Sequence, residues 1–318
     1  MPEVGPDDVL VRVGACGVSY RDVVERNGTY RRDVAYPSIL GLEIAGSVVG
    51  MGSLVADLAI GDHVCTKAFS SCGRCRLCRN GRETTCFERR PVRGGYAEYA
   101  ALPQDAVVRA PESLPFEIAC GLGPGAGVAL NACARPSRPC ASARPCWSPV
   151  PAAGVGVPAV QIARGCGARV LAVTRSEDKR AFLERIGVDE VLVAASGENY
   201  GKQVKAITGG GVDVVIDTVG SRAFDAAFDS LAVHGRYAMV GQLFGEDISI
   251  NPARIFFKRA QILGVGSVSR SQLEDAIALA VAGVVRPQIA RVLPLEDVAE
   301  AHRLVEGGAV AGRVILKP

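Results

Sequence analysis

Four cysteines between positions 72 and 86 constrain this chain more than any other feature of its sequence. The segment SSCGRCRLCRNGRETTC spaces them as C-x2-C-x2-C-x7-C, at Cys72, Cys75, Cys78 and Cys86. The loop is rich in Gly and Arg and has almost no apolar side chains to fold around, so the thiols need another purpose. Four thiolates complete the tetrahedral coordination of one zinc ion, and a closed site of this kind has no open position for chemistry. We therefore predict one structural zinc per chain; incidental free cysteines or an iron–sulfur site are the alternatives.

The composition is that of a globular protein with two hydrophobic cores, since 48% of the 318 residues are hydrophobic and 22% are charged. The net charge of +3 is spread along the chain without a basic block, which argues against a nucleic-acid groove. No apolar run reaches the length of about 18 residues that a membrane span needs, and the start MPEVGPDD is unlike a signal peptide. We expect a cytoplasmic protein that binds a small-molecule substrate and neither nucleic acid nor a membrane.

The pattern of predicted elements changes along the chain. Residues 9–13 alternate as a strand does, and GLEIAGSVVG at 41–50 mixes β-branched residues with glycine, so the first third is predicted to be β-rich. From Ala168 onward, short apolar strands alternate with helical stretches such as EDKRAFLERIG, which predicts a doubly wound parallel sheet. After Gly266, two amphipathic helices closed by glycine, SQLEDAIALAVAG and LEDVAEAHRLVEGG, precede a final strand GRVILK.

Three stretches together resemble the zinc-containing medium-chain dehydrogenase/reductase (alcohol dehydrogenase) superfamily: the cysteine lobe, GLEIAGSVVGMGS before it and GGYAEYA after it. With CGVSYRD, the lobe is most similar to the acryloyl-CoA reductase and quinone reductase branch. The resemblance implies an α/β fold in which a Rossmann doubly wound parallel sheet is inserted in a β-rich GroES-like catalytic domain. It implies a catalytic domain at 1–124 with its zinc lobe at 70–90, a Rossmann domain at 125–263, a return to the catalytic domain at 264–318, and assembly as a homodimer or tetramer.

The catalytic zinc of this superfamily is held by a first Cys, by the His of a Gly-His-Glu motif and by a later Cys. The resemblance places Ser19, Leu42 and Cys120 at these positions. A neutral hydroxyl and an apolar side chain are poor substitutes for thiolate and imidazole, so we expect no catalytic zinc. Cys16 is the alternative ligand, although its place at a strand end favours a small buried residue.

Without a Lewis acid to polarise an alcohol, the chemistry that remains is hydride delivery to an activated carbon, such as a conjugated C=C bond or a quinone. Tyr20 lies in a Tyr-Arg-Asp stretch that is similar to the corresponding site of zinc-free reductases. Its hydroxyl could donate a proton or a hydrogen bond to the developing enolate, with simple packing as the alternative. Glu43 is interpreted as a structural carboxylate of the same site. The candidate catalytic residues are Ser19, Tyr20, Glu43 and Cys120.

The cofactor site is predicted at one edge of the alternating sheet. The helix VGVPAVQIARG would hold the pyrophosphate at its N-terminus. The second strand runs into AVTRSEDK. No acidic residue stands at the strand end itself, where it would bind the ribose of NAD, whereas a Thr, an Arg and a Lys there suit the 2′-phosphate of NADPH. A solvated helix start is the alternative for the Arg and the Lys. The predicted cofactor-binding residues are Gly154, Val155, Gly156, Thr174, Arg175, Lys179, Val219, Gly220 and Gly241.

The stretch before that helix does not read as a central buried strand, because residues 133–153 contain five Pro, three Cys and the only Trp. We hypothesise a reading-frame error. With suitable synonymous codons for residues 140–152, dropping two bases yields Arg-Leu-Gly-Glu-Thr-Val-Leu-Val-Thr-Gly-Ala-Gly, the expected strand and glycine turn. As the sequence stands, it predicts weak or no cofactor binding. The resemblance begins at PEVGPDDVLVRV, so an earlier true start is also expected.

The sequence therefore predicts an NADPH-dependent oxidoreductase that reduces a small activated alkene of the enoyl-CoA kind, or a quinone, without a catalytic zinc. A zinc-dependent alcohol dehydrogenase with an altered ligand set is one alternative, and two zinc ions per chain would support it. A non-catalytic frameshifted or truncated product that retains only the structural zinc lobe is the other. Loss of NADPH binding with zinc retained would distinguish it.

Overall fold

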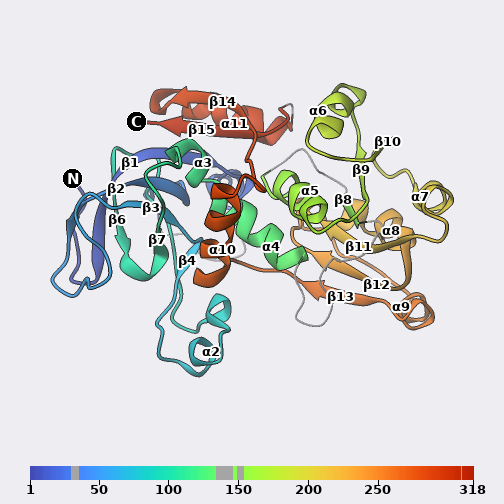
Figure 1. Ribbon diagram of the computed structural model, residues 1–318, viewed down its shortest axis with the longest axis horizontal. Coiled ribbons are helices and arrows are strands. Elements are labelled where there is room, and N and C mark those ends of the chain that lie inside the picture. Colours follow the sequence, from blue (N-terminus) through green and yellow to red (C-terminus); the bar gives the residue numbers. More distant parts are fainter. Residues whose placement is uncertain (30–35, 134–145, 149–153, 309) are drawn as a thin grey trace. The chain divides into compact units, whose positions relative to one another are not determined.

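A computed structural model describes residues 1–29, 36–133, 146–148, 154–308 and 310–318 (Figure 1). The chain divides into two compact units, and each is described by itself. The first comprises Met1–Gly127 and Ser267–Pro318, and the second comprises Val128–Gly266. No helix in the described ranges is long and apolar enough to cross a membrane.

The first unit is built on a sheet that β1 organises. Strand β1 pairs antiparallel with β2, β6 and β15, because its alternating sequence DVLVRV gives it one continuous apolar face. Val9, Val11 and Val13 on that face are at most 5% exposed. The sheet order is β14-β15-β1-β2-β3-β7, with β6 paired to β1. Its strands are β1 (Asp8–Val18), β2 (Glu43–Met51), β3 (His63–Thr66), β6 (Tyr99–Pro103), β7 (Val107–Arg109), β14 (Ile289–Pro294) and β15 (Arg313–Lys317).

Short helices and a small hairpin complete the first unit. The first third is β-rich and is followed near the C-terminus by two helices, as predicted. Strand β14 was not predicted. It is a mostly exposed edge strand in parallel pairing with β15, so its side chains carry little apolar signal. The other elements are α1 (Tyr20–Arg26), β4 (Phe69–Ser70), α2 (Arg76–Arg79), η1 (Glu83–Thr85), β5 (Arg90–Pro91), η2 (Gln104–Ala106), α3 (Phe116–Ala119), a π-helix η3 (Leu122–Gly127), α10 (Arg270–Val281), η5 (Leu295–Asp297) and α11 (Val298–Gly307).

The second unit is a six-stranded parallel sheet in the order β10-β9-β8-β11-β12-β13. Numbered within the unit this is 3-2-1-4-5-6, the order of a Rossmann sheet, and the predicted doubly wound fold is confirmed. The strands are β8 (Cys146–Ser148), β9 (Val170–Thr174), β10 (Glu190–Val193), β11 (Val212–Asp217), β12 (Leu231–Met239) and β13 (Gln261–Gly264). The helices are α4 (Val128–Cys133), α5 (Gly156–Gly165), η4 (Glu177–Lys179), α6 (Arg180–Arg185), α7 (Gly201–Thr208), α8 (Ser221–Ser230) and α9 (Pro252–Lys258).

The expectation that the Pro-rich stretch holds no central strand is wrong for Cys146–Ser148. These residues form β8, which pairs in parallel with β9 on one side and β11 on the other. The three residues lie between Pro145 and Pro149, so no proline interrupts their hydrogen bonds to the two neighbours. Most of the proposed frameshift segment lies outside the described residues.

Candidate functional site

The four cysteines of the lobe converge on one point. Their Sγ atoms all lie within 4.8 Å of one another, with separations of 3.5 Å for Cys75–Cys78 and Cys72–Cys86 and 4.0 Å for Cys72–Cys78 and Cys75–Cys86. Tetrahedral zinc with Zn–S bonds of about 2.3 Å needs sulfur separations of about 3.8 Å. The donor set therefore fits a structural zinc, and within the described ranges no other His, Cys, Asp and Glu side chains gather in this way.

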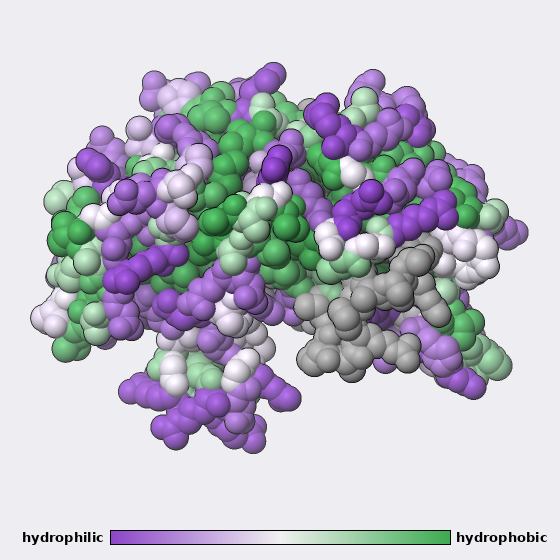
Figure 2. All heavy atoms as spheres, viewed as in Figure 1, coloured by the Kyte–Doolittle hydropathy of each residue, from purple (hydrophilic) through white to green (hydrophobic). Residues whose placement is uncertain are grey.

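The backbone of the lobe supports thiolate ligands. The amides of Cys72 and Glu88 each donate to Sγ of Cys86 over 3.3 Å, and the amide of Cys75 donates to Sγ of Cys72 over 3.4 Å. Gly73 adopts a φ of 67°, which allows the tight turn between the first two ligands. Figure 2 shows hydrophilic side chains crowded over the lobe around α2, with few apolar ones. A metal ion can supply the stability that a core does not provide here.

A buried lysine fastens the lobe to the sheet. Lys67 is 1% exposed, and its Nζ lies 3.0 Å from Asp105 Oδ2 and 3.3 Å from Glu83 Oε1. Asp105 also accepts hydrogen bonds from the amide and hydroxyl of Ser71, next to the first zinc ligand. Burial raises the pKa of Asp105, but the Lys67 charge and these hydrogen bonds lower it by more, so the net shift is downward. Glu83 belongs to η1, inside the lobe.

Ser19 stands at the start of α1, where its side chain is engaged with Asp22. Its amide and its hydroxyl both donate to Asp22 Oδ2, over 2.9 and 2.8 Å. Asp22 is 1% exposed, and its Oδ1 accepts the Gly41 amide over 3.1 Å. Burial raises the pKa of Asp22 while the hydrogen bonds from Ser19 and Gly41 oppose the rise. Leu42, at the second candidate metal position, is 3% exposed and packs in the core of the sheet.

The remaining candidate positions are buried thiols and an ion pair. Cys120 is fully buried with its Sγ directed at the Glu117 carbonyl over 3.4 Å, and Cys16 is fully buried in β1. Burial raises the pKa of both thiols, which favours the protonated form. Glu43 pairs with Arg313, with side chains 4% and 6% exposed. Burial lowers the pKa of Arg313 to about 10, while the charges of Cys16 and Asp22 oppose the shift.

Tyr20 is the first residue of α1 and is half-buried. It therefore adjoins Ser19 at the same helix end, and Asp22 lies two positions further on. Sequence analysis missed Arg313, although a charged residue in the apolar strand GRVILK was a visible signal. The structure thus gathers Ser19, Asp22 and Tyr20 at one helix start.

A chain of polar contacts leads from this site to the end of α1. The Tyr96 hydroxyl interacts with Asp22 and lies 3.3 Å from His302 Nε2. His302 Nδ1 lies 3.3 Å from Arg26 Nη1. Because a guanidinium can only donate, Nδ1 must accept, so a neutral His302 carries its proton on Nε2 and donates to Tyr96. Tyr96 and His302 were not predicted, since 206 positions separate them in the chain.

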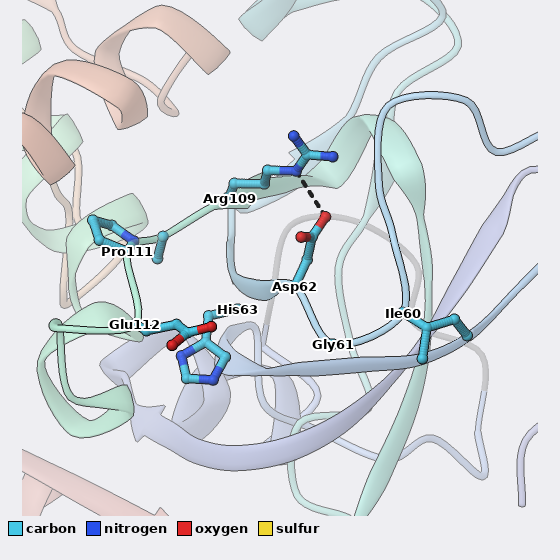
Figure 3. A pocket seen from close by; sticks show the side chains of 8 residues that line it. Ile60, Gly61, Asp62, His63, Arg109, Pro111 and Glu112 are labelled. Carbon is cyan, nitrogen blue, oxygen red and sulfur yellow. Dashed lines mark hydrogen bonds and ion pairs between the residues drawn. The ribbon is translucent and has the colours of Figure 1, made fainter.

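Two cavities open on the first unit. One, of about 600 Å³, is lined by residues that include Arg26, Ile39, Leu40, Tyr96, His302 and Arg303. The other, of about 440 Å³, has Asp62, His63, Arg109 and Glu112 on its walls (Figure 3). In Figure 3 the Arg109 guanidinium reaches Asp62, over 2.7 Å. None of the predicted site residues lines either cavity.

The predicted cofactor residues lie in the second unit, at the carboxyl ends of its strands. Thr174 ends β9 and accepts the Ser176 amide over 3.2 Å. Arg175 is exposed and Lys179 is half-buried on the turn that follows. Burial and the Arg175 charge both lower the pKa of Lys179, so the two cations are close enough to repel. An anion bound between them would relieve that repulsion, which fits a phosphate. Gly156 begins α5, with Val155 as its N-cap and Gly154 before it.

The loops after β11 and β12 are joined to each other. The Leu243 amide donates to the Val219 carbonyl over 2.9 Å, and the Gly241 amide donates to Asp217 over 3.2 Å. The Asp217 carboxylate is fully buried and accepts the amides of Val219 and Gly220. Asp217, which also accepts the Tyr237 hydroxyl over 2.5 Å, was missed by sequence analysis. An Asp ending the apolar strand VDVVID was the available signal. The structure thus brings Val219, Gly220 and Gly241 together.

Comparison with known proteins covers the whole chain. Residues 5–112 match the alcohol dehydrogenase GroES-like domain, and residues 154–282 match the zinc-binding dehydrogenase family. An acryloyl-coenzyme A reductase from Sulfurisphaera tokodaii is 30% identical, covering 100% of this chain and 94% of that protein. An alcohol dehydrogenase from Geobacillus stearothermophilus is 31% identical, covering 99% and 94%. A quinone oxidoreductase from Lama guanicoe is 30% identical, covering 97% and 88%. The crystal structure of AibC superposes with a TM-score of 0.92 at 37% identity, covering 100% of this chain and 90% of that one.

Proposed function

Because this chain belongs to the medium-chain dehydrogenase/reductase superfamily of NAD(P)-dependent oxidoreductases, we propose that it reduces a small activated alkene with NADPH and without a catalytic zinc. The observation that carries the proposal is the hydrogen bond from Ser19 to Asp22. It commits the Ser19 hydroxyl, at the first metal position, to a buried carboxylate. With Leu42 buried at the second position, Cys120 is the only one of the three metal positions that offers a soft donor, and Cys16 is a buried thiol of β1. A quinone, whose conjugated carbonyls also accept hydride, is the second substrate class.

The cofactor would supply hydride to the electron-poor carbon of the substrate. Thr174, Arg175 and Lys179 would hold its 2′-phosphate, while the amides at the start of α5 would donate to the pyrophosphate. Val219, Gly220 and Gly241 would line the nicotinamide and its ribose. The Pro-rich stretch led to the expectation of weak or no cofactor binding. The presence of β8 and α5 supports binding instead, because the first strand and helix of the dinucleotide-binding unit are both there.

Tyr20 would complete the reaction as the proton donor. Addition of hydride to the β-carbon of an α,β-unsaturated thioester places negative charge on the carbonyl oxygen. The Tyr20 hydroxyl would donate to this enolate and then protonate the α-carbon, regaining a proton from solvent. Each turnover consumes one NADPH and one proton and yields one saturated product. Two relatives, the acryloyl-coenzyme A reductase and the quinone oxidoreductase, have names that support this class.

The alcohol dehydrogenase relative defines the competing function, which needs a second zinc. The test combines metal analysis with activity on the same purified protein. We expect about one zinc per chain, NADPH-dependent reduction of an enoyl thioester, and no oxidation of primary or secondary alcohols. About two zinc ions per chain, with alcohol oxidation that disappears when the second is removed, would establish the alcohol dehydrogenase instead.

A further inference from the structure

The larger cavity of the first unit combines positive charge with an apolar wall. Arg26, at the end of α1, and Arg303, in α11, stand on its rim, and their side chains are 40% and 73% exposed. Ile39 and Leu40 supply apolar surface, with Ile39 56% exposed. Its volume of about 600 Å³ lies in the range of small-molecule sites. A ligand that fits must therefore carry both an anionic group and an aliphatic segment.

Both guanidiniums are held by carboxylates that an anionic ligand can replace. Arg26 Nη2 lies 3.0 Å from Glu306 Oε2, and Arg303 Nη1 lies 2.5 Å from Glu300 Oε2. Exposed pairs of this kind contribute little to stability. A phosphate offers more acceptor oxygens in a geometry that matches the guanidinium fork. The two carboxylates thus position the arginines and balance their charge when no ligand is bound, and a phosphate can displace them.

The cavity connects to the candidate catalytic site through its own lining residues. Tyr96 lies on its wall, where burial and the nearby Asp22 carboxylate raise the pKa of its hydroxyl, and Asp22 in turn accepts the Ser19 hydroxyl over 2.8 Å. Helix α1 also joins the two, because Tyr20 lies at one end of the helix and Arg26 at the other. At a rise of 1.5 Å per residue these ends are about 9 Å apart. A substrate whose reactive end lies at Tyr20 could therefore extend a non-reacting arm toward Arg26.

We propose that this cavity binds the phosphate-bearing arm of a thioester substrate, such as the phosphopantetheine portion of coenzyme A, through Arg26 and Arg303. The inference rests on the proposed function and adds the site that binds the non-reacting arm of the thioester. The apolar wall takes the aliphatic part of the arm, and the guanidiniums take its phosphate. The phosphates of NADPH share this chemistry, so the test must separate the two sources.

The test compares two substrates that carry the same acyl group, a coenzyme A thioester and its phosphate-free N-acetylcysteamine analogue. For Arg303→Gln, we expect the ratio of kcat/KM for the coenzyme A ester to kcat/KM for the analogue to fall about tenfold, chiefly through KM. Arg291→Gln is the matched control, since Arg291 is exposed on β14 of the same unit and lies outside the cavity. An unchanged ratio for Arg303→Gln would overturn the proposal.

A second variant is expected to lower KM, a result that misfolding would not produce. Glu306→Gln removes the carboxylate that competes for Arg26, so KM for the coenzyme A ester should fall about threefold and become more sensitive to salt. A rise in KM would contradict the proposal.

Binding measurements separate failure of this inference from failure of the proposed function. Titration with free coenzyme A requires no turnover, and its Kd should rise about tenfold in Arg303→Gln even if the reaction class has been misassigned. The Kd of NADPH should not change. If it rises equally, the cavity holds a cofactor phosphate, and the assignment to the substrate is wrong.

Discussion

The Ser19 hydroxyl donates a 2.8 Å hydrogen bond to the carboxylate of Asp22. Asp22 is buried and also accepts the amides of Ser19 and Gly41, so this contact belongs to the fold of the first unit. In the proposed assignment, the position that the superfamily uses for a metal-binding thiolate is thus occupied by a hydrogen-bond donor. This relationship connects the local structure of α1 to the kind of reaction we propose.

Replacing Tyr20 by Phe should lower kcat for enoyl thioester reduction at least 100-fold, because a positioned proton donor contributes about 10²–10⁴. The Kd of NADPH should not change. The solvent isotope effect on kcat should increase as protonation becomes limiting. Tyr99→Phe is the matched control, since Tyr99 is a half-buried tyrosine on β6 of the same unit. Equal kcat values for the two variants would remove Tyr20 from the mechanism.

Removing the charges beside β9 should change the preference between cofactors. In Arg175→Ala the Kd of NADPH should rise about tenfold, which corresponds to about 1.4 kcal/mol, whereas the Kd of NADH should stay within a factor of two. Lys179→Ala should act in the same direction. Fluorescence titration with both cofactors measures the effect. A parallel loss of NADH affinity would show that these side chains support the fold and do not read the 2′-phosphate.

Local patterns predicted much of this structure. The cysteine spacing lies within one loop, and the alternation of strands and helices after Ala168 repeats over short windows, so both could be read directly from the sequence. The alternation predicted the doubly wound sheet, whereas its insertion in a GroES-like domain was implied by the family resemblance. Strand β8 could not be read this way, because its pairing with β9 and β11 depends on neighbours far along the chain and prevails over the surrounding prolines.

The parts of the site that sequence analysis missed join distant segments. Glu43 and Arg313 meet because β2 and β15 both pair with β1, a relationship that exists only in the folded sheet. Tyr96 reaches His302 for the same reason, across the interface of the sheet and α11. Asp217 at a strand end was visible in the sequence, but its role in binding the amides of the following loop could be recognised only from the structure.

Lys67 and Lys317 provide a paired test of burial in one unit. Lys67→Met leaves the Asp105 and Glu83 carboxylates without their buried partner and should cost about 2–4 kcal/mol of unfolding free energy. Lys317 is 48% exposed in its pair with Glu117, so Lys317→Met should cost at most about 1 kcal/mol. Urea unfolding of the zinc-loaded proteins measures both. Similar losses would mean that Lys67 does not anchor the lobe as described.

The same ion pair predicts an acid dependence. Because the folded-state pKa of Asp105 is lowered, its stabilising effect is complete above the ordinary value of about 3.9 and is lost as the pH falls through the lower folded value. Lys67→Met lacks much of this effect, so the stability difference between wild type and variant should shrink below about pH 4. Unfolding curves of both proteins from pH 7 to pH 3 test this. A constant difference would indicate that Asp105 is not stabilised by Lys67.

The most direct test of the account is titration of the purified protein with NADPH, followed by fluorescence, with zinc content measured on the same sample. We predict a Kd in the micromolar range, a binding free energy of about −8 kcal/mol, with about one zinc per chain. Zinc at one per chain without NADPH binding would contradict the proposed reductase. It would show that the lobe is intact while the segment before α5 cannot serve the dinucleotide.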